Sequence, residues 1–503
     1  MSTDVQTAAG ELLQLTAPLG QVAAAAPADP TIPVGTNPVG LAFTSTGDLY
    51  VTNSGSSSVT LINTSTDTVI VPGIPEGGTT PAWLAIAPNG SAYIPNNISN
   101  NVSVIDTATN TVVGSPIPLA GGPAAAAVIP SGNVYVSRFA GNAVSVIDTS
   151  TNTVVGAAIP TGSGPVGIAV APNGNAYVAN RNSNTVTVID TTTNTVLVSL
   201  PVGNGPNFIA IAPNGHAYVA NINSNDVTVI DTASNTVLVP SLPVGTNPWG
   251  VAVGPDGNAY TANRGSNNVS VIDTATNTVV GSPIAVGSQP ISVAVAPNGK
   301  VYVANIASSN VSAIQFAPVL TSLSPTQGPT TGGTVVTITG TNLTGASVTI
   351  GGNPATGVIV NATGTQLTAA TPPGAAGPAT VTVTTPGGTA SLVGGFTYFV
   401  PAHATSLSAT PALSRLFPPQ VYYPFLNATL TDQVTGLPVS GQTITFRTGT
   451  QTLGTAVTNA HGTAQLSEAL TFPLILANGG YTATFAGTPT LLPSSANAGI
   501  IAP

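Results

Sequence analysis

Side chains that could perform acid–base or metal chemistry are scarce in this 503-residue chain. Histidine occurs only at positions 216, 403 and 461, and Glu76 is the one glutamate between residues 21 and 317. General acid–base catalysis needs at least one positioned titratable group, and a zinc site needs several His, Cys or carboxylate ligands. His216 follows a Pro-Asn-Gly turn signal, which predicts an exposed turn residue. We therefore expect no catalytic residue, no metal site and no cofactor.

Aspartate recurs in a Val-Ile-Asp-Thr motif, at Asp106, Asp148, Asp190, Asp231 and Asp273. An acidic ring is one interpretation of this recurrence. The favoured interpretation is turn chemistry, because an Asp carboxylate before Thr-x-Thr-Asn can accept the backbone N–H groups of the residues that follow. The repeated Asn of Tyr-Val-x-Asn is expected to act similarly, as a strand-end cap or a left-handed residue.

Three arginines and two tryptophans are the candidate ligand-binding residues: Arg138, Arg181, Arg264, Trp83 and Trp249. Guanidinium groups bind carboxylates and phosphates through paired N–H donors. The hypothesis is that the arginines grip a carboxylate, a phosphate or an acidic sugar, and that the tryptophans stack on a sugar ring. The alternatives are scattered solubilising charge for the arginines and core packing for the tryptophans.

A repeat must position these residues. Tyrosines and prolines recur together at intervals of 41 to 43 residues: Tyr50, Tyr93, Tyr135, Tyr177, Tyr218, Tyr260 and Tyr302, with Pro38, Pro81, Pro123, Pro165, Pro206, Pro248 and Pro290. Residues 165 to 203 show four short β-branched segments, a to d, separated by turn signals. Four strands in about 40 residues are typical of one blade of a β-propeller. The spacing predicts seven blades, each covered by its neighbours.

The seventh copy lacks a strand d. We expect part of residues 21 to 34 to supply it, which would join the two ends of the ring and remove its open edges. Because successive strands alternate in direction, the d–a and b–c loops share one side of the ring. That side carries the three arginines against Asp226 and Glu76. The a–b and c–d turns share the other side, which carries Lys300 against eight aspartates, at positions 48, 67, 106, 148, 190, 231, 256 and 273.

The copies resemble a known family. "YVTN" stands at 50 to 53, "YVAN" at 177, 218 and 302, and "SNTVTVIDTTTNTV" at 183 to 196. This pattern resembles the YVTN-type seven-bladed β-propellers of bacterial and archaeal surface proteins, over residues 21 to 317. Propellers of similar repeat type include streptogramin lyases and lactonases, whose chemistry uses His, acidic residues and often a divalent metal. The resemblance therefore also implies an alternative, a propeller enzyme.

Two further all-β modules are expected after the repeats. Residues 318 to 400, from "SPTQGPTTGG" to "FTY", resemble the IPT/TIG immunoglobulin-like domain, and residues 401 to 503 resemble bacterial Ig-like repeats of surface adhesins. Residues 1 to 20 are treated as an N-terminal extension. The fold class expected is thus all-β: a seven-bladed propeller closed by an N-terminal strand, followed by two immunoglobulin-like sandwiches.

Composition narrows the function. Net charge is −9 with six basic residues, and a nucleic-acid partner needs clustered Lys and Arg. There is no cysteine, and no apolar stretch is long enough for a membrane span. The alanine-rich start resembles a signal-peptide cleavage region but has no basic segment before it. We expect a secreted or cell-surface, non-catalytic binding or adhesion scaffold with a carbohydrate or protein partner. A self-associating surface-layer component is a further alternative.

Overall fold

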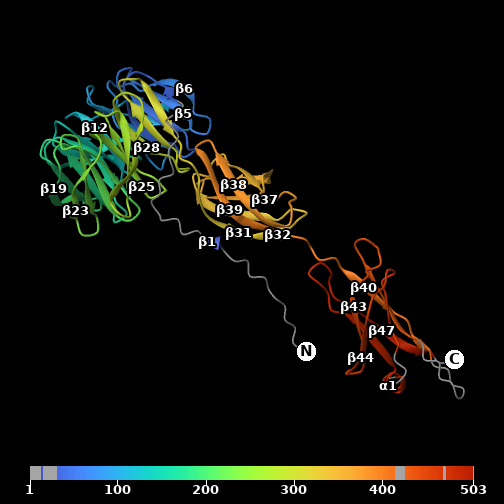
Figure 1. Cartoon of the computed structure of the whole chain (residues 1–503). Helices are drawn as coiled ribbons and strands as arrows, with labels where there is room; N and C mark the ends of the chain where they lie inside the picture. Colours follow the sequence, from blue (N-terminus) through green and yellow to red (C-terminus); the bar gives the residue numbers. More distant parts are fainter. Residues whose placement is uncertain (1–12, 15–30, 414–424, 468–471, 502–503) are drawn as a thin grey trace, which may run out of the picture. The chain divides into compact units, whose positions relative to one another are not determined.

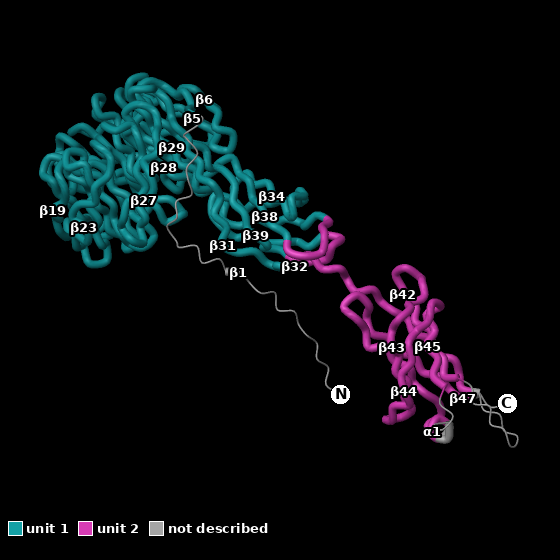
Figure 2. The backbone as a smooth tube through the Cα atoms, in the orientation of Figure 1, with its two compact units in different colours: residues 1–326, 333–372, 379–396 teal, residues 327–332, 373–378, 397–503 magenta. Residues whose placement is uncertain are grey.

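The computed structural model describes residues 13–14, 31–413, 425–467 and 472–501. Nearly all regular structure in them is β-strand, and α1 (Phe472–Ala477) is too short to cross a membrane. The prediction of an all-β chain is confirmed. Two compact units are present (Figure 2): residues 1–326, 333–372 and 379–396 form the first, and residues 327–332, 373–378 and 397–503 form the second.

Residues 31–314 form seven antiparallel sheets, one for each repeat (Figure 1), and each sheet is called a blade below. From the innermost strand outward the blades are: blade 1, β3 (Pro38–Phe43), β4 (Leu49–Asn53), β5 (Ser58–Asn63) and β6 (Thr68–Pro75); blade 2, β7 (Ala85–Ile86), β8 (Ser91–Asn96), β9 (Asn101–Asp106), then β10 (Thr111–Val112) and β11 (Ile117–Pro118); blade 3, β12 (Pro123–Val128), β13 (Val134–Arg138), β14 (Ala143–Asp148) and β15 (Thr153–Pro160); blade 4, β16 (Pro165–Val170), β17 (Asn175–Asn180), β18 (Thr185–Asp190) and β19 (Thr195–Pro201); blade 5, β20 (Pro206–Ile211), β21 (His216–Asn221), β22 (Asp226–Asp231) and β23 (Thr236–Pro243); blade 6, β24 (Pro248–Val253), β25 (Asn258–Asn263), β26 (Asn268–Asp273) and β27 (Thr278–Ala285); blade 7, β28 (Pro290–Val295), β29 (Val301–Asn305), β30 (Asn310–Ile314) and β2 (Thr31–Pro33).

The ring closes between its two chain ends. β2, from the N-terminal side, pairs antiparallel with β30, so that Ile32 lies opposite Val311. This is the fourth strand predicted from residues 21 to 34, of which residues 21–30 lie outside the described part of the chain. The innermost strands contact one another in sequence, and β28 of blade 7 contacts β3 of blade 1.

The repeated tyrosines join neighbouring blades. All seven are fully buried. Five of them donate through the hydroxyl to a left-handed asparagine in the c–d turn of the next blade: Tyr50 to Asn110, Tyr93 to Asn152, Tyr135 to Asn194, Tyr177 to Asn235 and Tyr218 to Asn277. Blade 7 has no c–d turn, because its outer strand comes from the N-terminal side, and Tyr260 donates to Asp256 of its own blade instead.

The last junction has an added ion pair. Tyr302 of blade 7 donates to Asp67 in the c–d turn of blade 1, at 2.8 Å. Asp67 takes the left-handed place that asparagine has in blades 2 to 6. Lys300 Nζ lies 2.8 Å from the other carboxylate oxygen of Asp67, and the Lys300 side chain is 8% exposed. Tyr302 and Lys300 of blade 7 therefore both bind Asp67 of blade 1, at the junction where the ring closes.

The repeated aspartates have the predicted turn role. Each accepts the backbone N–H of the residue two positions on, as in Asp148 to Ser150 and Asp190 to Thr192, at 2.8 Å in both. Of the two roles expected for the Asn of Tyr-Val-x-Asn, the position at a strand end is confirmed and the left-handed conformation is wrong. Asn180 and its counterparts lie at the buried end of strand b and are not left-handed; the Asn180 amide donates to Thr187 of strand c at 2.8 Å. Pairing with strand c keeps this residue extended, and its buried amide needs a partner there.

Two pairs of sheets follow the propeller. The first pair lies in residues 319–399, apart from β1 (Leu13–Gln14), which pairs with β31 (Val319–Ser324). One sheet continues from β31 to β33 (Val335–Thr341), β37 (Gln366–Ala370) and β36 (Thr356–Val360), and the other holds β32 (Gln327–Pro329), β39 (Gly388–Phe399), β38 (Gly377–Thr385), β34 (Ser347–Ile350) and β35 (Asn353–Pro354). Beyond them, β40 (Thr405–Ala409), β42 (Leu426–Asp432) and β45 (Thr463–Leu466) form one sheet. The other holds β41 (Ala412–Leu413), β47 (Ser494–Ile501), β46 (Gly480–Phe485), β43 (Thr443–Thr448) and β44 (Gln451–Val457), and the two enclose one core that includes Phe446 and Phe485.

Within the first unit, residues 333–372 and 379–396 lie against the end of the propeller chain. The Asn342 side chain donates to the Ala317 carbonyl at 3.2 Å. A Cβ placed on Gly387 would lie 2.2 Å from the Phe316 carbonyl oxygen, so only glycine allows this approach. The Phe316 ring in turn packs on Tyr260 at 5.6 Å between ring centroids. The segment that replaces a c–d turn in blade 7 is therefore covered by the following module.

Candidate ligand-binding face

Two aromatic rings from different blades meet beside the innermost strands of the propeller. Trp83 of blade 2 and Phe208 of blade 5 occupy the same position of the repeat, two residues after its proline. Their ring centroids lie 4.6 Å apart, and the ring planes are inclined at 48°. The other five copies have Gly40, Ala125, Gly167, Gly250 and Ser292 there. At the glycine copies the next innermost strand leaves no room for a side chain: a Cβ on Gly250 would lie 2.8 Å from the Ile291 carbonyl oxygen.

Beside these rings, two arginines converge on one tryptophan. Trp249 follows the proline of blade 6, and the guanidinium carbons of Arg181 and Arg264 lie 4.9 Å and 5.0 Å from the centre of its ring. Arg181 comes from the b–c loop of blade 4, and Arg264 from the corresponding loop of blade 6. Cation–π attraction of this kind stabilises a guanidinium by about 0.5–2 kcal/mol. The three half-buried side chains are called the Arg–Trp cluster below.

The cluster is held by neutral partners. Arg181 Nη2 donates to the buried Asn207 side chain, whose own amide donates to the Trp249 carbonyl at 3.2 Å. Arg264 Nη2 donates to Gln289 Oε1 at 3.0 Å. The indole N–H of Trp249 donates to Asn247 at 2.8 Å. None of these partners carries a negative charge.

The electrostatics of the Arg–Trp cluster are therefore unbalanced. Among the described residues the ion pairs are Lys300–Asp67 and His403–Asp432, and neither cluster arginine takes part in one. Burial, and then the charge of Arg264, lowers the pKa of Arg181 to about 10, so the group is still cationic at neutral pH. The Nε atoms of both arginines and Nε1 of Trp83 are buried without a hydrogen-bond partner in the described part of the chain. Such donors are costly unless something accepts from them.

Arg138 is not part of this cluster. It occupies the place of the repeated Asn in "YVSR", one residue earlier than Arg181 and Arg264 in their copies, and Phe139 takes the place of those arginines. Its Nε donates to the Ala120 carbonyl at 2.7 Å. Phe139 instead lies beside Arg181, 5.8 Å from its guanidinium carbon. Of the five predicted site residues, the structure brings together Arg181, Arg264 and Trp249, places Trp83 against Phe208, and leaves Arg138 apart.

A pocket opens next to Arg264, between blades 6 and 7. Its volume is about 350 Å³, and it is lined by Asn247, Arg264, Gly265, Asn267, Ser288 and Gln289. The loops of two blades supply these residues, and all but Gly265 carry polar side chains. Sequence reasoning missed Phe208, Asn207 and Gln289. Comparison of equivalent repeat positions could have found Phe208, because an aromatic residue stands there where most copies have glycine, alanine or serine.

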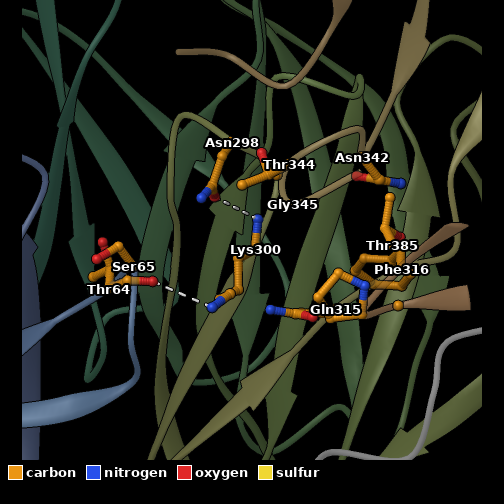
Figure 3. A pocket seen from close by; sticks show the side chains of 13 residues that line it. Thr64, Ser65, Asn298, Lys300, Gln315, Phe316, Asn342, Thr344, Gly345 and Thr385 are labelled. Carbon is orange, nitrogen blue, oxygen red and sulfur yellow. Dashed lines mark hydrogen bonds between the residues drawn. The ribbon is translucent and has the colours of Figure 1, made fainter. Parts of the chain in front are cut away.

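The expectation that His216 is an exposed turn residue needs correction, because it is half-buried and begins a strand. His216 is the first residue of β21, at the opposite end of that strand from the b–c loops, and its ring lies 3.3 Å from the Asn214 amide. No group of three or more His, Asp or Glu residues lies close enough to hold a metal within the described ranges. A second pocket, of about 200 Å³, is shown in Figure 3. Its one cation, Lys300, is already bound to Asp67 and to the Thr64 carbonyl.

Glu76 is the unexpected titratable group. It lies in the d–a loop before blade 2, is 0% exposed, and takes the place where other copies have Val202, Val244 and Val286. Burial raises its pKa to about 8, against a smaller lowering effect from Asn96. With the Asn96 amide nitrogen turned toward the carboxylate, the two groups lie 2.8 Å apart.

Comparison with known proteins supports the fold of two segments. The IPT/TIG domain family matches residues 318–398, as predicted. A streptogramin B lyase is 15% identical with a TM-score of 0.51, covering 60% of this chain and 100% of that one. A catalytically inactive virginiamycin B lyase from Staphylococcus aureus, with quinupristin, is 17% identical with a TM-score of 0.50, covering 60% and 98%. Hydrazine synthase of Kuenenia stuttgartiensis is 22% identical with a TM-score of 0.48, covering 56% and 96%. The search of curated proteins found no match. At these identities the structural similarity shows the propeller fold alone.

Proposed function

We propose that this chain is a non-catalytic, secreted or cell-surface binding protein whose propeller holds an anionic ligand at the Arg–Trp cluster. The observation that carries the proposal is a pair of half-buried guanidinium groups on one indole, neither of which forms an ion pair with any described residue. Burying charge without a counterion is unfavourable, so two uncompensated cations in one place favour a binding role. The YVTN-type family and the bacterial Ig-like family of residues 401–503 are parts of the same proposal.

The net negative charge of the chain restricts anion binding to the Arg–Trp cluster. The chain has a net charge of −9, so an anion is repelled by most of the molecule and attracted only where positive charge is concentrated. Of the chain's five arginines, two are in the Arg–Trp cluster. The residues after the propeller then have different roles: the IPT/TIG module packs against the end of the propeller chain, and residues 401–503 serve as the spacer or tether.

The enzyme alternative rests on fold similarity. The described side chains that meet beside the innermost strands include Trp83, Phe208, Trp249 and the two arginines, and none of these five is a general base or a metal ligand at neutral pH. The surface-layer alternative predicts self-association, and size measurement of the purified chain distinguishes it from a monomeric binding protein.

Binding of acidic polysaccharides tests the proposal. Polygalacturonate, alginate and heparin are compared with neutral dextran by calorimetry at low and at moderate salt. We expect at least one acidic polymer to bind with salt-sensitive affinity and dextran not to bind. The double variant Arg181→Ile, Arg264→Ile should lose at least tenfold in affinity, and it is compatible with the fold because Ile222 and Ile306 occupy this position in blades 5 and 7.

Arg447→Ala is the control for loss of an arginine outside the cluster. Arg447 lies in β43, where its Nε donates to Thr452 at 3.2 Å, and its replacement removes one positive charge, against two in the double variant. It should leave binding unchanged. Equal binding by the double variant and the wild type, or no binding of any acidic polymer, would contradict the proposal.

A further inference from the structure

The pocket beside Arg264 indicates which class of anion the site binds. This inference rests on the proposed function. The pocket lies between the loops of blades 6 and 7, and its volume of about 350 Å³ is at the lower end of small-molecule sites. One cation, three side-chain amides, one hydroxyl and one glycine line it. None of its six described lining residues is aromatic, so a flat aromatic ligand finds no ring to stack on among them.

The amide oxygens of the pocket are already used by internal hydrogen bonds. Gln289 Oε1 accepts from Arg264 at 3.0 Å, and Asn267 Oδ1 accepts from the Gln289 backbone N–H at 2.8 Å. Asn247 Oδ1 accepts from Trp249 at 2.8 Å. These bonds fix the orientation of each amide, because turning it would place nitrogen against a donor.

The groups left over are donors. Asn267 Nδ2, Gln289 Nε2 and Arg264 Nη1 donate to no acceptor among the residues that the structure describes. The pocket therefore offers several free N–H groups, whereas each of its amide oxygens already accepts one hydrogen bond. A ligand that fits it must present oxygen atoms as acceptors around its body, as hydroxyl, ether and carboxylate oxygens do.

The charge of the pocket selects among oxyanions. Arg264 is the one charged residue of the lining, so the pocket supplies a single positive charge in a planar fork. A carboxylate matches both the charge and the plane of that fork, whereas a phosphate dianion would keep one charge uncompensated.

We propose that this pocket binds a polyhydroxylated carboxylate, namely a uronic acid unit, with its carboxylate on Arg264 and its ring oxygens on Asn267 and Gln289. A free sugar acid and a unit within an acidic polysaccharide share this chemistry. They differ in whether neighbouring sugar units add contacts along the blade loops.

Titration with four probes tests the assignment. D-galacturonate, its methyl ester, D-galactose and inorganic phosphate are added to the full chain and followed by saturation-transfer NMR and calorimetry. We expect galacturonate to bind at least tenfold more tightly than the other three. Tri-galacturonate is the fifth probe: tighter binding than the monomer assigns the site to a polysaccharide, and equal binding assigns it to the free acid.

Two substitutions, each taken from the equivalent position of another blade, test the roles of Arg264 and Gln289. Arg264→Ile introduces the residue of blades 5 and 7, and Gln289→Asn introduces the residue that blades 1 and 6 have at this place. We expect a loss of at least tenfold from the first and of at least threefold from the second, with unchanged thermal unfolding. Arg181→Ile, outside the pocket lining, should weaken galacturonate less than Arg264→Ile does.

The outcomes separate this inference from the proposed function. If phosphate binds as tightly as galacturonate and both depend on Arg264, the anion-binding function stands and the uronic acid assignment is wrong. If galactose binds as well as galacturonate, the carboxylate has no role and the assignment is again wrong. If no anion binds in an arginine-dependent way, both proposals fail.

Discussion

Replacing Lys300 with methionine should destabilise the propeller at the junction that closes the ring. Lys300 Nζ lies 2.8 Å from Asp67, and the two side chains are 8% and 11% exposed. At this distance the attraction between unit charges is about 6 kcal/mol for an effective dielectric constant of 20, before desolvation is subtracted. Removing one partner of a buried pair costs about 3–5 kcal/mol, because the other charge remains buried.

The neighbouring copies provide the compensating change. Asparagine takes the place of Asp67 in blades 2 to 6 and accepts the tyrosine hydroxyl there, as in Tyr177 to Asn235. Adding Asp67→Asn to Lys300→Met should therefore restore most of the lost stability, since Tyr302 keeps an acceptor and no buried charge remains. With the single variant Asp67→Asn measured as well, the double-mutant cycle gives the coupling energy of the two side chains.

Tryptophan fluorescence in urea isolates this effect, because Trp83 and Trp249 are the two tryptophans of the chain and both lie in the propeller. With a slope of about 3 kcal/mol per M urea, a loss of about 3–5 kcal/mol lowers the midpoint by about 1–1.7 M. An unchanged midpoint in Lys300→Met, or a double variant no more stable than the single one, would refute the reasoning.

Two further predictions concern packing and pH. Glu76 has a folded-state pKa of about 8 against 4.5 for the free group, so its contribution to stability is fully present below pH 4.5 and is lost as pH rises through 8. Urea midpoints should fall over this range by the equivalent of up to about 5 kcal/mol and stay flatter in Glu76→Val; equal slopes would contradict the assignment. Gly250→Ala, whose Cβ would lie 2.8 Å from the Ile291 carbonyl oxygen, should cost about 1–3 kcal/mol, whereas Gly73→Ala, with its nearest atom at 3.8 Å, should cost less than half as much.

The sequence predicted those parts of the fold that depend on local pattern. Tyr50 and its counterparts, with turn signals between short strands, defined the repeat, and the missing strand d of the last copy predicted the pairing of β2 with β30. Asp148 and its counterparts were assigned to turns from the residues that follow them. Each of these features follows from the order of residues and strands within one copy of the repeat.

Contacts across the ring could not be predicted in the same way. Trp83 and Phe208 belong to blades 2 and 5, and only closure of the circle brings their rings together. Arg138 was grouped with Arg181 and Arg264 because all three lie on the b–c side of the ring. It stands one repeat position earlier than the other two, and its side chain binds the Ala120 carbonyl instead of joining them. The contact of Asn342 with Ala317 depends on how a module packs on the ring.

Side-chain NMR of the arginines and tryptophans tests the central claim most directly. The chain has five arginines and two tryptophans, so the Nε–H spectrum of the intact protein contains few signals. On titration with polygalacturonate, the account predicts shifts for the Nε–H groups of Arg181 and Arg264 and for the Trp249 indole, with Arg138 and Arg447 unaffected. Uniform shifts of all five arginines, or none at the Arg–Trp cluster, would contradict the claim that this cluster binds an anion.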